Sequence, residues 1–150
     1  MIQTYVIDTD SNSSEKTISI LSRENTISVV GQSDKLMVNA KALKKVDVVL
    51  LHSSLPSDDA IALVRNVSKQ HRNIKVLVMG LRRSEAGALA FIEAGACGYI
   101  YEDDSYVELV RNINAAHEDR ARISTRMAAC LMERLQELKA LSAKLDHVYQ

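Results

Sequence analysis

Short apolar runs alternate with longer amphipathic stretches over most of this chain. Runs of this kind are typical of strands buried on both faces, and five occur: residues 5–7, 27–31, 46–51, 74–79 and 98–101. Apolar residues also recur at helical spacing in five stretches: residues 14–23, 34–44, 58–70, 85–94 and 105–117. The alternation predicts an α/β fold, with a doubly wound, five-stranded parallel sheet and helices on both faces.

Right-handed crossovers leave few ways to arrange such strands, and we expect the flavodoxin-like order 2-1-3-4-5. In that order the carboxyl ends of the first and third strands meet at the topological switch point, where open α/β sheets bind their ligands. Asp8, Thr9 and Asp10 follow the first strand, and His52 ends the third. We therefore expect these four residues to line one crevice.

A different pattern begins at Ser124, which together with Thr125 is typical of a helix N-cap. No glycine or proline follows as far as Gln150, so one long helix is predicted. Alternating spacings of four and three residues define a heptad seam: Met127, Leu131, Arg134, Leu138, Leu141, Leu145 and Val148. We divide the chain into an α/β domain, residues 1–120, and a linker or dimerisation helix, residues 121–150.

A long helix with one apolar side needs a partner surface. The seam could pack on the α/β domain of the same chain or on the same helix of a second copy. We expect the second arrangement, a parallel homodimeric coiled coil, in which Arg134 is the polar seam position that sets the register.

Composition narrows the function classes. The 150 residues carry 19 basic and 19 acidic side chains, and this zero balance argues against binding nucleic acid or anionic lipid by bulk charge alone. Cys97 and Cys130 are not in a metal-ligand spacing, which argues against a zinc site. The sequence shows neither a signal peptide nor a membrane-spanning run, so we expect a cytoplasmic protein without a membrane contact.

Three segments resemble the receiver domain of response regulators, over roughly residues 2–118. They are the acidic cluster after the first strand, the segment Asp47–Pro56, and the stretch Ala90–Ile100. In the second segment the proline comes four places after His52, as it follows the phospho-acceptor in that family. The third is similar to the entry into the fifth strand of LuxR-type regulators. The resemblance implies a CheY-like fold.

The resemblance also implies a site, and most of its positions are altered here. Active receivers hold a magnesium ion with two acids and an acceptor aspartate, which becomes phosphorylated. Asp8 matches the first acid, but Thr9 stands at the second, with Asp10 one place late, and His52 replaces the acceptor. Imidazole is a poor magnesium ligand and cannot form an acyl phosphate.

Three further positions complete the comparison. Gly80 stands where the family has a hydroxyl that senses the phosphoryl group, and glycine has no side chain to donate a hydrogen bond. Glu102 stands where the family has a lysine, which places negative charge against an incoming phosphoryl group. Tyr99 matches the switch aromatic: it either turns inward above Gly80 or stays half-exposed at the strand start.

These losses predict an atypical receiver that is not an enzyme, needs no metal or cofactor, and works without phosphorylation. We expect it to act in transcription regulation through dimerisation or a protein partner. DNA would be bound only by a helix-turn-helix domain that is absent from this chain and would follow residue 150.

Alternatives stay open. In our preferred interpretation, His52 fills the vacated space. Alternatively, it is a phosphohistidine, a metal ligand, or a pH sensor paired with Asp8, Asp10, Glu102 or Asp103. The chain as a whole could instead transfer phosphoryl groups through an unconventional site. It could also be a stand-alone receiver that senses a protein partner, or a small ligand in the vacated pocket.

Overall fold

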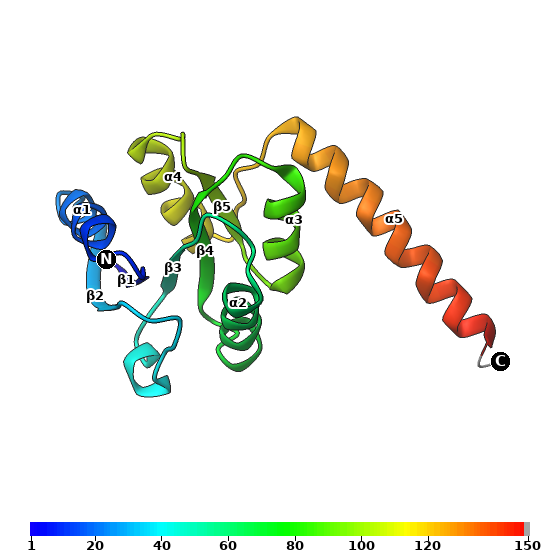
Figure 1. Cartoon of the computed structure of the whole chain (residues 1–150), viewed down its shortest axis with the longest axis horizontal. Helices are drawn as coiled ribbons and strands as arrows, with labels where there is room; N and C mark the ends of the chain where they lie inside the picture. The colour runs from blue at the N-terminus through cyan, green and yellow to red at the C-terminus, as the bar shows by residue number, and fades with distance from the viewer. Residues whose placement is uncertain (149–150) are drawn as a thin grey trace.

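The computed structural model describes residues 1–148 as a twisted parallel sheet between two layers of helices, followed by a helix that projects away from them (Figure 1). The strand order β2-β1-β3-β4-β5 confirms the predicted topology. The strands are β1 (Ile2–Ile7), β2 (Ile27–Ser33), β3 (Val48–His52), β4 (Lys75–Leu81) and β5 (Gly98–Tyr101). All four neighbouring strand pairs are parallel.

Two helices cover each face of the sheet. Leu21 of α1 and Ile113 of α4 pack on one face, whereas Val64 of α2 and Phe91 of α3 pack on the other. The helices are α1 (Ser11–Leu21), α2 (Asp58–Gln70), α3 (Glu85–Ala94), α4 (Tyr106–His117) and α5 (Thr125–Val148). The bounds predicted for α2, α3 and β5 are confirmed, and the other boundaries shift by a few residues.

The helix predicted over residues 34–44 is wrong. That stretch contains only a short 3-10 helix, η1 (Ala40–Leu43), because local hydrogen bonds compete with an α-helix. The Ser33 hydroxyl lies 2.9 Å from the carbonyl oxygen of Lys35, and the Asn39 side chain accepts from the Lys41 N–H at 3.0 Å. Leu36 and Val38 both pack against the core. This spacing of two residues is typical of extended backbone, in which every second side chain lies on the same face.

The ring of Tyr5 covers part of the sheet that this helix would have covered. Tyr5 is buried, and its hydroxyl donates to the carbonyl oxygen of Gln32 at 3.3 Å, so the side chain lies across β2. A Cβ atom at Gly31 would come within 2.6 Å of the ring. The glycine is therefore required by the close approach of the Tyr5 ring, and not by its own backbone conformation.

The first turns of α5 dock on the chain's own domain. Ser124 caps the helix by accepting from the Met127 N–H at 3.0 Å, and Met127 is fully buried against the α2 and α3 side of the core. Leu131 packs there in part, and the guanidinium of Arg134 pairs with Glu93 of α3. Three of the seven seam positions thus meet the same chain.

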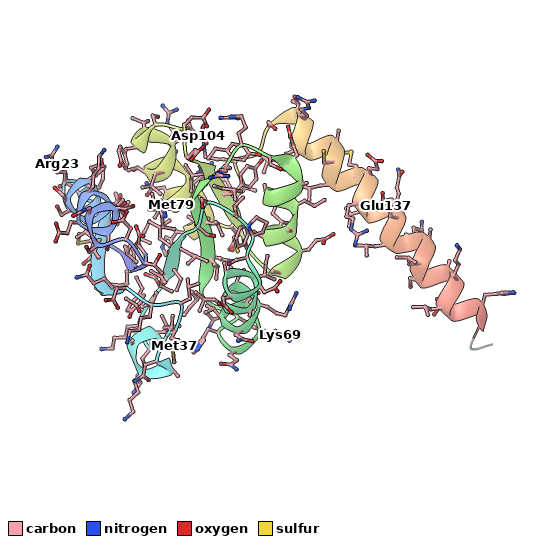
Figure 2. The ribbon with its side chains drawn as sticks, in the orientation of Figure 1. Arg23, Met37, Lys69, Met79, Asp104 and Glu137 are labelled. Carbon is pink, nitrogen blue, oxygen red and sulfur yellow. The ribbon has the colours of Figure 1, made fainter. Side chains whose placement is uncertain are left out.

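The remaining turns of α5 leave the domain. Figures 1 and 2 show this part of the helix, beyond Glu137, extending past the end of α3. Leu138, Leu141 and Leu145 are exposed there. The side chain of Val148 lies outside the described part of the chain. Among residues 1–148, no helix is long and apolar enough to cross a membrane.

We expect Met127→Ala to lower the free energy of unfolding by about 2–4 kcal/mol, because it leaves a cavity where α5 meets the domain. Urea denaturation measures the change. Met132→Ala in the same helix is the matched control, since this side chain is 65% exposed, and it should change the stability by no more than about 0.5 kcal/mol. Equal effects of the two substitutions would contradict the docked position of α5.

Candidate functional site

His52 lies at the carboxyl end of β3, as the sequence predicts. Its backbone is in register with Met79 of β4, and its side chain is 30% exposed. The Nδ1 atom lies 3.8 Å from Oδ1 of Asp8, which follows β1 and is 1% exposed. The structure therefore brings the ends of the first and third strands together at the switch point.

Gly80 forms the third part of this cluster. It lies within β4, and a Cβ atom there would come within 2.8 Å of Cδ2 of His52 and still closer to Nε2. The backbone of Gly80 also has a φ of 73°, a conformation that residues other than glycine adopt only at a cost in free energy. The imidazole thus occupies the space that a side chain at position 80 would need. The imidazole of His52 and a side chain at position 80 would therefore exclude each other.

Asp8 is buried on the other side of the imidazole. Its Oδ1 accepts from the backbone N–H of Asp10 at 2.9 Å, whereas Oδ2 has no hydrogen-bond partner among the described residues. Burying a carboxylate is costly unless positive charge or hydrogen bonds compensate for the lost water. His52 is the one basic side chain within 4.0 Å of it in the described structure, so a protonated imidazole would stabilise the Asp8 carboxylate.

The other acidic candidates do not join this cluster in the described contacts. Asp10 is the N-cap of α1, where its carboxylate accepts from the N–H of Asn12 at 3.0 Å, and Thr9 is exposed. Glu102 is exposed directly after β5. Asp103 pairs with Arg83 at 3.0 Å. Of the four acids that the pH-sensor alternative names, the described contacts bring only Asp8 to His52.

Tyr99 is buried in β5 and is not half-exposed. Its ring lies 5.2 Å from that of Tyr101, and burial raises the pKa of Tyr99 to about 12. The space above Gly80, which the inward alternative assigned to the Tyr99 ring, is taken by His52. The guanidinium of Arg83 stacks over Tyr101 at 4.5 Å, a cation–π contact that the sequence analysis missed.

A concavity of about 550 Å³ adjoins the two tyrosines. The segment between α4 and α5 forms one of its walls through Arg122, Ile123 and Ser124. Arg122 is held to Glu108 of α4 by contacts of 3.2 Å to both carboxylate oxygens. The start of α5 therefore lies beside Tyr99, at this end of β5.

The sequence is similar to response regulators. It is 26% identical over 141 residues to the DNA-binding transcriptional activator DevR/DosR of Mycobacterium tuberculosis, covering 91% of this chain and 64% of that protein. It is 25% identical over 130 residues to the response regulator GacA of Pseudomonas viridiflava, covering 85% of this chain and 61% of GacA. The chain thus spans less than two thirds of either relative. No protein-family model matches it.

Solved structures agree with these relatives. The response regulator ChrA of a haem-sensing two-component system matches with a TM-score of 0.69 and 29% identity, over 90% of this chain and 66% of that one. The chain therefore has the fold of a response-regulator receiver domain. The NarL receiver domain of Mycobacterium tuberculosis shares the fold, with a TM-score of 0.70 and 22% identity, over 79% of this chain and 98% of that domain.

The residues at this crevice do not fit the magnesium ion that active receiver domains hold. Magnesium requires several oxygen ligands in near-octahedral geometry. Asp8 is the one carboxylate within 4.0 Å of His52, and the Asp10 carboxylate is engaged at the N-terminus of α1. Among the described residues, no three His, Cys, Asp or Glu side chains are grouped so that they could hold a metal ion.

We expect Gly80→Ser to destabilise the α/β domain by about 2 kcal/mol, because the new side chain meets His52 and the backbone has a positive φ. His52→Ala should remove the first of these causes and leave the second. In urea denaturation, the double substitution should therefore recover about 1 kcal/mol relative to the sum of the single ones. Strict additivity would show that His52 does not occupy the space over Gly80.

Proposed function

We propose that this receiver domain works without aspartyl phosphorylation and transmits its signal through protein contacts. The observation that carries the proposal is the packing of the His52 imidazole against Gly80 and Asp8. One side chain takes the position of the acceptor and fills the space next to it, where active receivers have the sensing hydroxyl. Neither the covalent step nor its readout has the groups that it needs.

Acetyl phosphate and beryllofluoride with magnesium test this proposal. We expect no phosphoryl adduct in the intact mass and no saturable change in the amide NMR spectrum around residues 8, 52 and 80. A receiver that keeps the acceptor aspartate, treated in parallel, shows that the reagents are active. A stoichiometric adduct, or saturable beryllofluoride binding at the crevice, would overturn the proposal and favour an unconventional phosphotransfer site.

For the output, we propose homodimerisation through the exposed part of α5, in the service of transcription regulation. The contacts of Met127 and Arg134 within the chain leave Leu138, Leu141 and Leu145 as the free section of the apolar seam. Such a helix gains most from packing against a second apolar surface. The relative DevR/DosR is described as a DNA-binding transcriptional activator, and DNA binding by this protein would belong to a domain outside the present chain.

The dimer can be tested on α5 itself. We expect the unmodified chain to have the molar mass of a dimer in light scattering, and Leu138→Glu with Leu141→Glu to give a monomer, because charges in the seam prevent packing. Ser142→Glu with Ala143→Glu is the control, since it adds the same two charges at exposed positions outside the seam. A monomeric parent chain would exclude this interface.

A further inference from the structure

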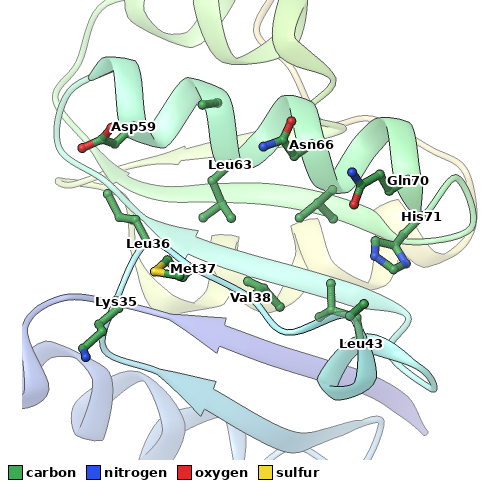
Figure 3. A pocket seen from close by; sticks show the side chains of 13 residues that line it. Lys35, Leu36, Met37, Val38, Leu43, Asp59, Leu63, Asn66, Gln70 and His71 are labelled. Carbon is green, nitrogen blue, oxygen red and sulfur yellow. The ribbon is translucent and has the colours of Figure 1, made fainter.

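A groove lies where the crossover from β2 to β3 lacks its α-helix. It has a volume of about 560 Å³ and runs between the segment 35–43 on one side and α2 on the other (Figure 3). Doubly wound folds cover this part of the sheet with a helix. Here the chain supplies an extended segment and a 3-10 helix, which leave one side of α2 without a helical neighbour.

The floor of the groove is apolar. Leu36, Val38 and Leu43 come from the segment before β3, and Leu63 and Val67 come from α2. Figure 3 shows Leu63 directed from α2 towards the segment that carries Leu36 and Val38. A row of apolar side chains from another molecule would therefore find partners on both walls.

Met37 stands at the edge of the same groove and is 74% exposed. Methionine is flexible and polarisable, and it is enriched at surfaces that adapt to helical partners. Its exposure here leaves an apolar side chain at the groove mouth that has no packing role within the domain.

Exposed lysines predominate in the segment that forms one wall of the groove, although Asp34 directly precedes it. Lys35, Lys41, Lys44 and Lys45 are exposed, and no acidic residue lies between Lys35 and Val46. None of these four lysines forms an ion pair with the described residues, although the chain as a whole has a net charge of zero. The α2 wall adds Asp59 at one end, followed by the neutral Asn66 and Gln70. An occupant with negative charge on one flank would be complementary to this basic edge.

We propose that the groove binds an acidic amphipathic helix of a protein partner. The α2 wall from Asp59 to His71 is about 18 Å long, which matches some three turns of helix. The chain's own α5 fits the charge poorly, because residues 132–147 carry three acidic and three basic side chains: Glu133, Glu137 and Asp146, with Arg134, Lys139 and Lys144. The inference does not depend on the phosphorylation proposal, since the groove and the crevice share no residue.

Designed peptides test the site on the full chain. The probe has about 14 residues, with leucines at helical spacing on one face and glutamates on the other. A second peptide replaces every glutamate with lysine, and a third scrambles the leucine positions. We expect the acidic peptide to shift amide NMR signals of residues 35–45 and 59–71, and to bind at least about tenfold more tightly than either control.

Substitutions then locate the binding. Two variants, Met37→Glu and the double variant Lys44→Glu with Lys45→Glu, should each weaken the binding of the acidic peptide. We expect the Kd from fluorescence anisotropy to rise about tenfold, without a change in thermal stability. Lys139→Glu with Lys144→Glu is the control for charge, because it makes the same change on α5 and should leave binding intact.

Three outcomes would overturn the inference: no groove shifts with the acidic peptide, equal binding of the acidic and basic peptides, or shifts confined to other faces. Tighter binding of a peptide with the sequence of residues 132–148 would also overturn it, and would assign the groove to α5 of a second copy.

Discussion

A parallel sheet buried on both faces needs a cover over every strand, and much of this structure follows from how that requirement is met. Two α-helices lie on each face. The crossover between β2 and β3 contributes none, because it contains only the short 3-10 helix η1. The Tyr5 ring over Gly31 makes up for the missing helix in part, and a groove beside α2 remains. At the other edge, Met127 extends the same core into α5. The groove beside α2 and the docked start of α5 are thus both related to how the α2 and α3 face of the sheet is covered.

At the switch point, the side chain of residue 52 limits which residue fits at position 80. An imidazole at position 52 lies against the backbone of position 80, so a side chain there would have no room. The same imidazole approaches the buried carboxylate of Asp8, which otherwise has one oxygen without a partner. Asp8, His52 and Gly80 therefore form one packed cluster at the switch point.

The C-terminal helix serves two surfaces along one apolar seam. Its first turns pack against α3 and lie next to Tyr99 through the preceding segment, whereas its later leucines face away from the domain. The helix is thus in contact with the domain at one end and carries an exposed apolar surface at the other.

The sequence alone determined the strand order, the bounds of α2 and α3, and the residues at the strand ends, because buried parallel strands and amphipathic helices leave strong periodic patterns. It failed at residues 34–44, where the hydroxyl of Ser33 and the amide of Asn39 bond to nearby backbone, and where Val38 points inward beside Leu36. It placed Asp8 and His52 in one crevice but did not predict the contact of His52 with Gly80, and it placed Met127 and Arg134 in an interface between copies. Only the tertiary structure decided these points. Each depends on which surface a side chain meets across the fold, and sequence spacing carries no information about that distance.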